Sequence, residues 1–194
     1  RIVSLCTPDK NGQKADVVLG LKSIDDYLTA TGVYHGAIVG RVIGRIAKGT
    51  FELDGKTLSL AINNGANHQH GGLKGFHNQV WNVKTVTDSS IVLSYCSIDG
   101  EMGYPGTLNV EATYQLTSNN ELILKFLATT DKTTIVNLTN HAFFNLAGEG
   151  NGTILDHILT IPSNYFCAVN PDKIKTGELL KVSGTPFDFS KGKS

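Results

Sequence analysis

The chain has 194 residues and a mass of 20.8 kDa, which is enough for one domain with a sizeable core. Its 17 basic and 17 acidic residues give a formal net charge of zero. This balance argues against nucleic-acid binding, which needs a basic surface to displace counterions from phosphates. No apolar run approaches the roughly 18 residues of a membrane-spanning helix, so membrane insertion is not expected.

The cysteines are three in number and far apart (Cys6, Cys96 and Cys167), and no Cys-x-x-Cys motif is present. This excludes a zinc ribbon or a thioredoxin-type site. An odd number of cysteines and the lack of a basic and then apolar leader predict a cytoplasmic protein with free, buried thiols. Because the chain begins at Arg1 rather than Met, we interpret it as a fragment or a processed product.

Apolar and polar residues alternate with a period of two along most of the chain, which indicates strands with one buried face. The clearest pair is 107–116 and 121–128, joined by a loop at 118–120 that is rich in asparagine. Asp54-Gly55 is the strongest signal for a two-residue hairpin. The predicted strands, in chain order, are 2–5, 16–19, 50–53, 57–60, 80–86, 91–98, 107–116, 121–128, 135–139, 155–161 and 165–169.

A short helix is predicted over 23–31, with Ser23 as N-cap and two aspartates in its first turn. Strands that recur without helices between them predict an all-β fold, an antiparallel sandwich or barrel. The 21 glycines fit the many turns of such a fold. No repeat, low-complexity tract or linker is present, so we expect residues 1–194 to form a single domain.

His68, His70 and His77 lie in a glycine-rich stretch, 63–77. A strand carrying His68-x-His70 would place both imidazoles on one face, as in a metal site. The preceding acidic residues, Glu52 and Asp54, are more than ten positions away from His68, so the third and fourth ligands are missing from this stretch. Two further interpretations stay open. In the first, the histidines are solvated residues of a surface loop. In the second, the loop presents an imidazole to a small polar ligand, and the glycines after His70 allow that ligand to approach the backbone closely.

His141 lies among three asparagines and two phenylalanines in the stretch 135–146. Such a mixture forms either a hydrogen-bonded core network or a polar pocket with an aromatic wall, which is the chemistry of a sugar site. The glycine-rich stretch 36–45 lacks both the GxGxxG pattern and a GK[ST] ending, so it is not a nucleotide loop. Its arginines, Arg41 and Arg45, either reach an anion or a hydroxyl, or lie at the surface.

Further motifs extend along almost the whole chain and follow one another in a fixed order. They include Gly40-Arg41-Val42-Ile43-Gly44-Arg45, Asn63-Asn64-Gly65, His70-Gly71-Gly72-Leu73-Lys74-Gly75-Phe76, Gly103-Tyr104-Pro105-Gly106, Asn137-Leu138-Thr139-Asn140-His141, Thr176-Gly177-Glu178 and Thr185-Pro186-Phe187-Asp188. Together they resemble the aldose 1-epimerase (galactose mutarotase) family.

This resemblance implies a large antiparallel β-sandwich of the galactose mutarotase-like type, incomplete in this chain. It also implies interconversion of the α and β anomers of hexoses such as glucose and galactose. A base removes the C1 hydroxyl proton and an acid protonates the ring oxygen; the ring opens, the C1–C2 bond rotates, and the aldehyde recloses. The family needs neither a metal nor an organic cofactor.

Carried over to this sequence, the resemblance makes His141 the general acid at the ring oxygen. His70 matches the second imidazole, which binds and polarises the same region of the sugar, and Arg45 matches the arginine that hydrogen-bonds sugar hydroxyls. Two positions depart from the family pattern: Gly44 stands where Asn is frequent, and His77 stands where Asp is frequent.

The family continues beyond the position of Ser194 and supplies its glutamate base and a sugar-binding aspartate there. We therefore expect truncation at the C-terminus and slight truncation at the N-terminus, with a companion chain or C-terminal segment completing the sandwich. Glu101 and Glu178, in apparent turns, and Glu149, in a glycine-rich loop, are poor replacements for the base. The alternatives are a non-catalytic sugar-binding module and an interaction domain with a vestigial pocket.

Overall fold

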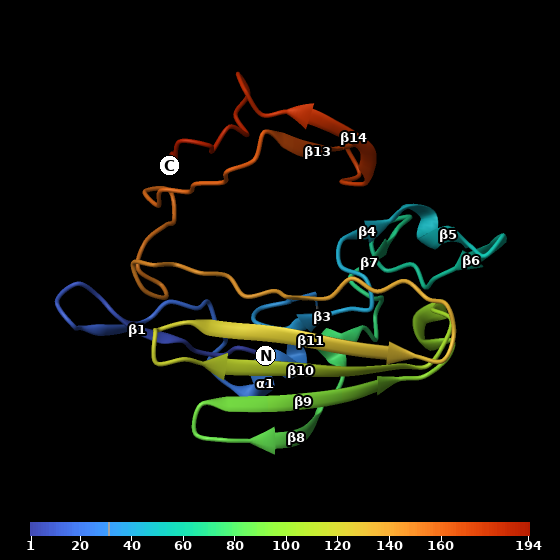
Figure 1. Cartoon of the computed structure of the whole chain (residues 1–194), viewed down its shortest axis with the longest axis horizontal. Helices are drawn as coiled ribbons and strands as arrows, with labels where there is room; N and C mark the ends of the chain where they lie inside the picture. The colour runs from blue at the N-terminus through green and yellow to red at the C-terminus, as the bar shows by residue number, and fades with distance from the viewer. Residues whose placement is uncertain (31) are drawn as a thin grey trace. The chain divides into compact units, whose positions relative to one another are not determined.

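The computed structural model describes residues 1–30 and 32–194, and short strands dominate it (Figure 1). This confirms the all-β prediction. Within the described ranges, no helix has the length and apolar character needed to cross a membrane. Contacts divide the chain into two compact units: unit 1 comprises Arg1–Ile38 and Asn140–Ser194, and unit 2 comprises Val39–Thr139. That 1–194 form one domain stays a prediction.

Unit 2 contains a four-stranded antiparallel sheet in the order β11-β10-β9-β8 (Figure 1). Its strands are β8 (Asn82–Val86), β9 (Ser90–Ser97), β10 (Leu108–Leu116) and β11 (Leu122–Thr130). Alternate residues of β10 are buried, namely Leu108, Val110 and Ala112, as the period-two pattern predicts. The β10–β11 hairpin is confirmed, and its turn places Asn120 at φ 62°.

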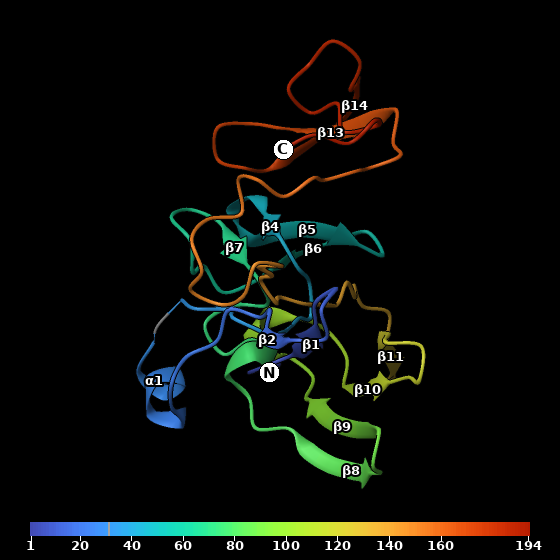
Figure 2. The same ribbon diagram turned by 90° about the vertical axis from the view of Figure 1, so that its left-hand side faces the viewer.

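Two smaller strand pairs complete unit 2. The hairpin of β5 (Thr50–Leu53) and β6 (Lys56–Ser59) turns at Asp54 and Gly55, whose φ values of 50° and 72° fit the predicted two-residue turn. β4 (Arg45–Ile46) pairs antiparallel with β7 (His68–Gln69) (Figure 2). The 3₁₀ turns of this unit are η1 (Ala47–Gly49), η2 (Phe76–Asn78) and η3 (Glu101–Gly103).

Unit 1 consists of short pairs and one short helix. β1 (Cys6–Pro8) pairs with β2 (Lys14–Asp16), and β13 (Tyr165–Val169) pairs with β14 (Lys175–Lys181) (Figure 2). Helix α1 (Ile24–Thr29) begins after Ser23, whose hydroxyl accepts the Asp26 N–H as predicted. Thr31, the last residue of the predicted helix, lies outside the described residues. The chain passes between the units at β3 (Ile38–Val39) and β12 (Thr139–Asn140).

Four predicted strands are wrong or mostly wrong. Of 16–19, only Asp16 lies in a strand, and Val18 makes an isolated bridge. Residues 2–5 form no strand, because the Asp16 carboxylate accepts the N–H of Leu5 (2.9 Å) and replaces a strand partner there. Of 135–139, only Thr139 is in a strand, and Asn137 makes an isolated bridge. Residues 155–161 have a single bridge, at Leu159.

Other expectations also need correction. The sequence pattern did not predict β14, and Glu178 lies in that strand rather than in a turn. Cys6, Cys96 and Cys167 are free as expected, but all three are exposed and none is a core residue. Exposure follows from position: Cys96 alternates with the buried-face residues of β9, so its side chain lies on the opposite face of the sheet.

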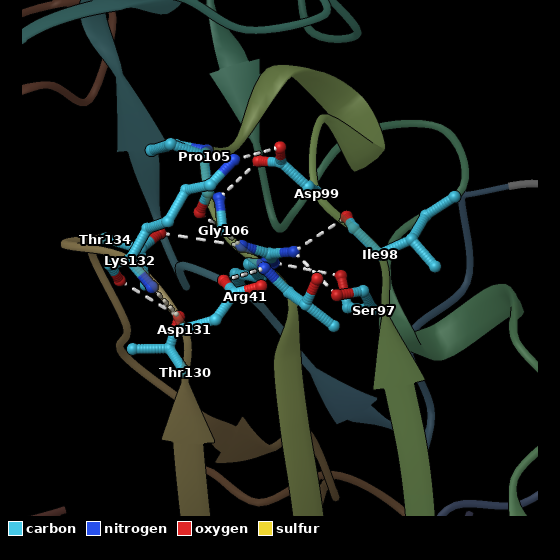
Figure 3. A network of polar contacts seen from close by, with 11 residues as sticks. Arg41, Ser97, Ile98, Asp99, Pro105, Gly106, Thr130, Asp131, Lys132 and Thr134 are labelled. Atoms are coloured by element: carbon cyan, nitrogen blue, oxygen red, sulfur yellow. Dashed lines mark hydrogen bonds and ion pairs between the residues drawn. The ribbon is translucent and has the colours of Figure 1, made fainter.

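Arg41 is buried in unit 2, with only 1% of its surface exposed. Figure 3 shows the polar contacts around it. Its Nε donates to the Ser97 hydroxyl (2.9 Å) and its Nη2 to the carbonyls of Ser97 (2.9 Å) and Ile98 (3.0 Å). Its Nη1 donates to the Pro105 carbonyl (2.9 Å). Burial lowers the pKa of Arg41, and the nearby Glu101 carboxylate opposes that shift. Arg41 therefore belongs to the fold and is not available to a ligand.

We expect Arg41→Met to lower the free energy of unfolding by about 3–5 kcal/mol, because it leaves the carbonyls of Ser97, Ile98 and Pro105 without their donor and removes the positive charge near the Glu101 carboxylate. Urea denaturation measures this. Lys84→Ala is the control, since it removes only an exposed ion pair with Glu111 and should leave stability near that of the wild type. A loss below about 1 kcal/mol in the Arg41 variant would contradict the structural role.

Candidate functional site

The β4–β7 ladder brings two of the predicted site residues to the same end of unit 2. Arg45 lies opposite Gln69 and Ile46 opposite His68. The pairing extends one step further, because the His70 N–H donates to the Gly44 carbonyl (3.1 Å). Arg45, paired with Gln69, and His70, bonded to Gly44, therefore lie at neighbouring positions along the two chain segments.

The His70 ring is held in one tautomer by the backbone. Its Nδ1 accepts a hydrogen bond from the Gly44 N–H (3.2 Å), which requires that Nδ1 carry no proton. The neutral ring then bears its proton on Nε2 and presents an N–H donor there. An imidazole of this kind can bind and polarise an oxygen atom, which is the role that the family resemblance implies for His70.

The backbone after His70 runs through the left-handed region at three residues in succession: His70 (φ 52°), Gly71 (φ 86°) and Gly72 (φ 90°). A Cβ on Gly71 would lie 1.7 Å from the Gly40 carbonyl oxygen. We predicted that these glycines allow close approach to a ligand. In the structure, the close approach of Gly71 is to the protein's own backbone, so this glycine fixes the path of the His70 loop.

His68 faces the core of unit 2 and is fully buried. Its Nδ1 lies 2.6 Å from the Ala61 carbonyl, and its Nε2 lies 2.7 Å from the Tyr104 hydroxyl. The carbonyl can only accept, so Nδ1–H donates to it and Nε2 accepts from Tyr104. Burial lowers the pKa of His68, against the opposing Ala61 hydrogen bond. Both nitrogens are used by the fold, which removes His68 from the His68-x-His70 metal interpretation.

No group of three or more His, Cys, Asp or Glu side chains able to hold a metal occurs among residues 1–30 and 32–194. Two of the three carboxylates considered as replacements for the base already accept hydrogen bonds. Glu101 accepts the Tyr95 hydroxyl (2.5 Å) and the Ser97 hydroxyl, and Glu149 accepts the Gly20 N–H (2.8 Å). Glu178 is exposed on β14.

Arg45 is partly buried and held at one nitrogen. Its Nε donates to Oδ1 of Asn64 at 2.9 Å. Across the described ranges, its terminal nitrogens have no hydrogen-bond partner. Asn63 supports the same ladder from the other side: its Nδ2 donates to the Gln69 carbonyl (2.9 Å) and its Oδ1 accepts the Gln69 N–H (2.7 Å). The loop 63–69 thus contacts both strands that carry the site residues.

His141 lies in unit 1, whereas Arg45 and His70 lie in unit 2. Its backbone donates to the Ala37 carbonyl (2.8 Å) and accepts from the Gly36 N–H (3.1 Å). Its ring stacks on Tyr34 with centroids 5.5 Å apart and contacts Phe143 at 4.9 Å. The imidazole is thus partly buried and contacts two aromatic rings, those of Tyr34 and Phe143; that they form the wall of a sugar site stays a prediction.

The predicted Asn137 and Asn140 behave differently from one another. Asn140 stays in unit 1, where its Nδ2 donates to the Gly36 carbonyl (2.8 Å) and its Oδ1 accepts the Ala142 N–H (2.9 Å). Asn137 acts through its backbone, which bonds the Arg41 carbonyl (2.8 Å) and the Ile43 N–H (2.9 Å). Each therefore has a structural contact that the sequence pattern alone did not reveal.

A family model described as aldose 1-epimerase matches residues 1–194. The chain belongs to the aldose 1-epimerase family. It is 48% identical over 190 residues to galactose mutarotase of Sus scrofa, a match that covers 98% of this chain and 55% of the relative. It is 34% identical over 192 residues to aldose 1-epimerase of Escherichia coli K12, covering 99% and 55%. The chain thus spans about half the length of the curated relatives it matches.

Solved structures of the family are also similar. An aldose epimerase homologue from C. elegans aligns with a TM-score of 0.93 and 35% identity, covering 99% of this chain and 58% of that one. A galactose 1-epimerase from Lactobacillus acidophilus NCFM aligns with a TM-score of 0.83 and 32% identity, covering 92% and 53%. The galactose mutarotase-like fold inferred from the motifs is therefore confirmed.

Gly71→Ala should destabilise this family member far more than Gly65→Ala. Both glycines have positive φ, but a Cβ at Gly65 meets nothing within 4 Å, so it costs only the backbone strain of about 1–2 kcal/mol. The Gly71 variant adds the clash with Gly40, for about 2–5 kcal/mol in total. Urea denaturation compares the two, and equal losses would refute the close approach.

The buried His68 makes stability depend on pH. Its pKa is lowered in the folded state, so below about pH 6.5 the unfolded chain binds the extra proton and is favoured. Stability should therefore fall as the pH drops from 7.5 to 5.5. His68→Gln should show a shallower fall, measured by urea denaturation across that range. Parallel profiles for the two proteins would contradict the assignment.

Proposed function

We propose that this chain carries the imidazoles and the arginine of a hexose 1-epimerase site, and acts in the interconversion of the α and β anomers of sugars such as galactose and glucose. The observation that carries the proposal is the pair on the β4–β7 ladder. His70, when neutral, carries its proton on Nε2, and Arg45 has terminal nitrogens without a partner among the described residues. The family match over residues 1–194 supports it.

In this proposal His141 gives a proton to the ring oxygen as the C1–O5 bond breaks. His70 donates its Nε2–H to the same region of the sugar and stabilises the charge that develops there. Arg45 binds hydroxyls and orients the ring. The Tyr34 and Phe143 rings beside His141 supply an apolar surface of the kind on which sugar C–H groups pack.

The base that takes the C1 hydroxyl proton is proposed to be a glutamate outside these 194 residues. Support comes from the carboxylates themselves, because Glu101 and Glu149 are already hydrogen-bonded within their own units. Loss of a general base costs about 10²–10⁴-fold in rate. The 194-residue chain alone is therefore proposed to bind hexose and to catalyse weakly or not at all.

The segment that would carry this glutamate is also the proposed partner, either a companion chain or a C-terminal continuation. Unit 1 exposes large apolar side chains along 143–187, including Leu146, Leu155 and Ile158 at 74–78% exposure, which a further segment would cover.

We also propose the cytoplasm as the compartment, since the three cysteines are free thiols. Neither nucleic acid nor membrane is a proposed partner.

Polarimetry of freshly dissolved α-D-galactose and α-D-glucose tests the proposal. We expect the chain, supplemented with the remaining part of the family domain, to accelerate mutarotation, and His141→Ala or His70→Ala to lower the rate about 10²–10⁴-fold. The control is His157→Gln, which keeps an acceptor for the Leu146 N–H and lies outside the proposed site.

Three outcomes are distinct. Rates that survive both histidine variants would refute the assigned roles. A protein that binds hexose but never exceeds the buffer rate would favour the non-catalytic sugar-binding module. Absence of both binding and mutarotation would refute the proposed function and favour an interaction domain with a vestigial pocket.

A further inference from the structure

Two arginines, four residues apart on one segment of unit 2, are held in opposite ways. Arg41 is buried, and its Nε, Nη1 and Nη2 all donate within the fold (Figure 3). Arg45 is partly buried and donates only from Nε, to Asn64 at 2.9 Å. Its terminal nitrogens have no hydrogen-bond partner among residues 1–30 and 32–194. The first arrangement stabilises the fold, whereas the second leaves donors available.

A contact at Nε alone has a specific geometric effect. The guanidinium is planar and its five N–H groups point in fixed directions, so a hydrogen bond at Nε restrains the plane of the whole group. The edge formed by Nη1 and Nη2 stays open, and its parallel N–H groups can donate together to two neighbouring oxygens. Two adjacent hydroxyls of a sugar ring offer such a pair.

Asn64 is itself well placed to act as a fixed acceptor. Its N–H donates to the Asn67 carbonyl (3.0 Å), and the Asn67 N–H donates back to the Asn64 carbonyl (3.0 Å). The Asn67 side chain accepts the Lys48 N–H (3.0 Å), just beyond β4. Backbone hydrogen bonds thus close the turn that carries Asn64, and the Asn67 side chain joins that turn to η1, which follows β4.

The β4–β7 pairing does not depend on the Asn64 side chain. Backbone hydrogen bonds join the strands, and Asn63 holds the Gln69 backbone with two further hydrogen bonds. The contact between Arg45 Nε and Asn64 Oδ1 therefore adds little to the pairing of the strands and mainly orients the Arg45 side chain. Without it, Arg45 would lose rotamer entropy on binding a ligand, which would weaken binding.

We propose that Asn64 is a positioning residue for Arg45, which it holds ready to bind two adjacent sugar hydroxyls. This inference rests on the proposed function, because it assigns hexose binding to Arg45. It adds a residue that does not touch the sugar and acts only through the arginine.

The first test needs no sugar. In ¹⁵N NMR of the arginine Nε–H groups, we expect Asn64→Ala to lower the order parameter of Arg45 Nε and to speed its hydrogen exchange severalfold. Asn64→Asp retains an acceptor at Oδ1 and should restore the wild-type order. Asn119→Ala, in the exposed β10–β11 turn, is the matched control. An unchanged Arg45 signal in Asn64→Ala would overturn the proposal.

The second test measures hexose affinity by NMR titration in a double-mutant cycle. Asn64→Ala should raise the Kd about two- to tenfold, the range expected for one hydrogen bond, and should have no effect in an Arg45→Ala background. Equal effects in both backgrounds would overturn the positioning role. If Arg45→Ala itself binds as tightly as the wild type, the proposed function of Arg45 fails instead, and the positioning role in sugar binding fails with it.

Discussion

The backbone path of residues 40–45 determines where unit 2 places Arg45 and the loop at His70, and Arg41 fixes that path. Once its guanidinium is buried among the carbonyls of Ser97, Ile98 and Pro105, the neighbouring backbone has little freedom. The Gly40 carbonyl then accepts the Phe76 N–H (3.2 Å), and the Gly44 carbonyl accepts the His70 N–H. One buried cation thereby sets the positions of the imidazole loop and of Arg45.

Histidines only two residues apart take opposite roles because the backbone conformation changes between them. His68 lies in β7 with its ring in the core, where burial lowers its pKa and its Nε2 contacts the Tyr104 hydroxyl. His70 has left the strand at φ 52°, and its Nδ1 is turned onto the Gly44 N–H. The same side chain thus stabilises the core in one place and presents a donor in the other.

Sequence periodicity could predict the long strands of unit 2, because a strand with one buried face leaves a period-two pattern such as Leu108, Val110 and Ala112. It failed where single side chains replace strand pairing, as Asp16 does for Leu5. The family motifs placed His70, Arg45 and His141 among the site candidates. Nothing in the local pattern distinguished Arg41 from Arg45, since both follow a glycine and only the long-range partners of Arg41 make it structural.

Asn64 shows why a sequence motif alone does not reveal which residues orient the ligand-binding side chains of a site. A residue that touches a ligand is constrained by the ligand's chemistry, whereas a residue that orients it is constrained only by the geometry of the chain around it. Asn64 belongs to the Asn63-Asn64-Gly65 motif, but the motif alone does not show that its side chain reaches Arg45, because that contact depends on the pairing of β4 with β7. The Asn64 contact nevertheless restrains the terminal donors of Arg45, because a planar guanidinium held at Nε can redirect its other N–H groups only by moving as a whole.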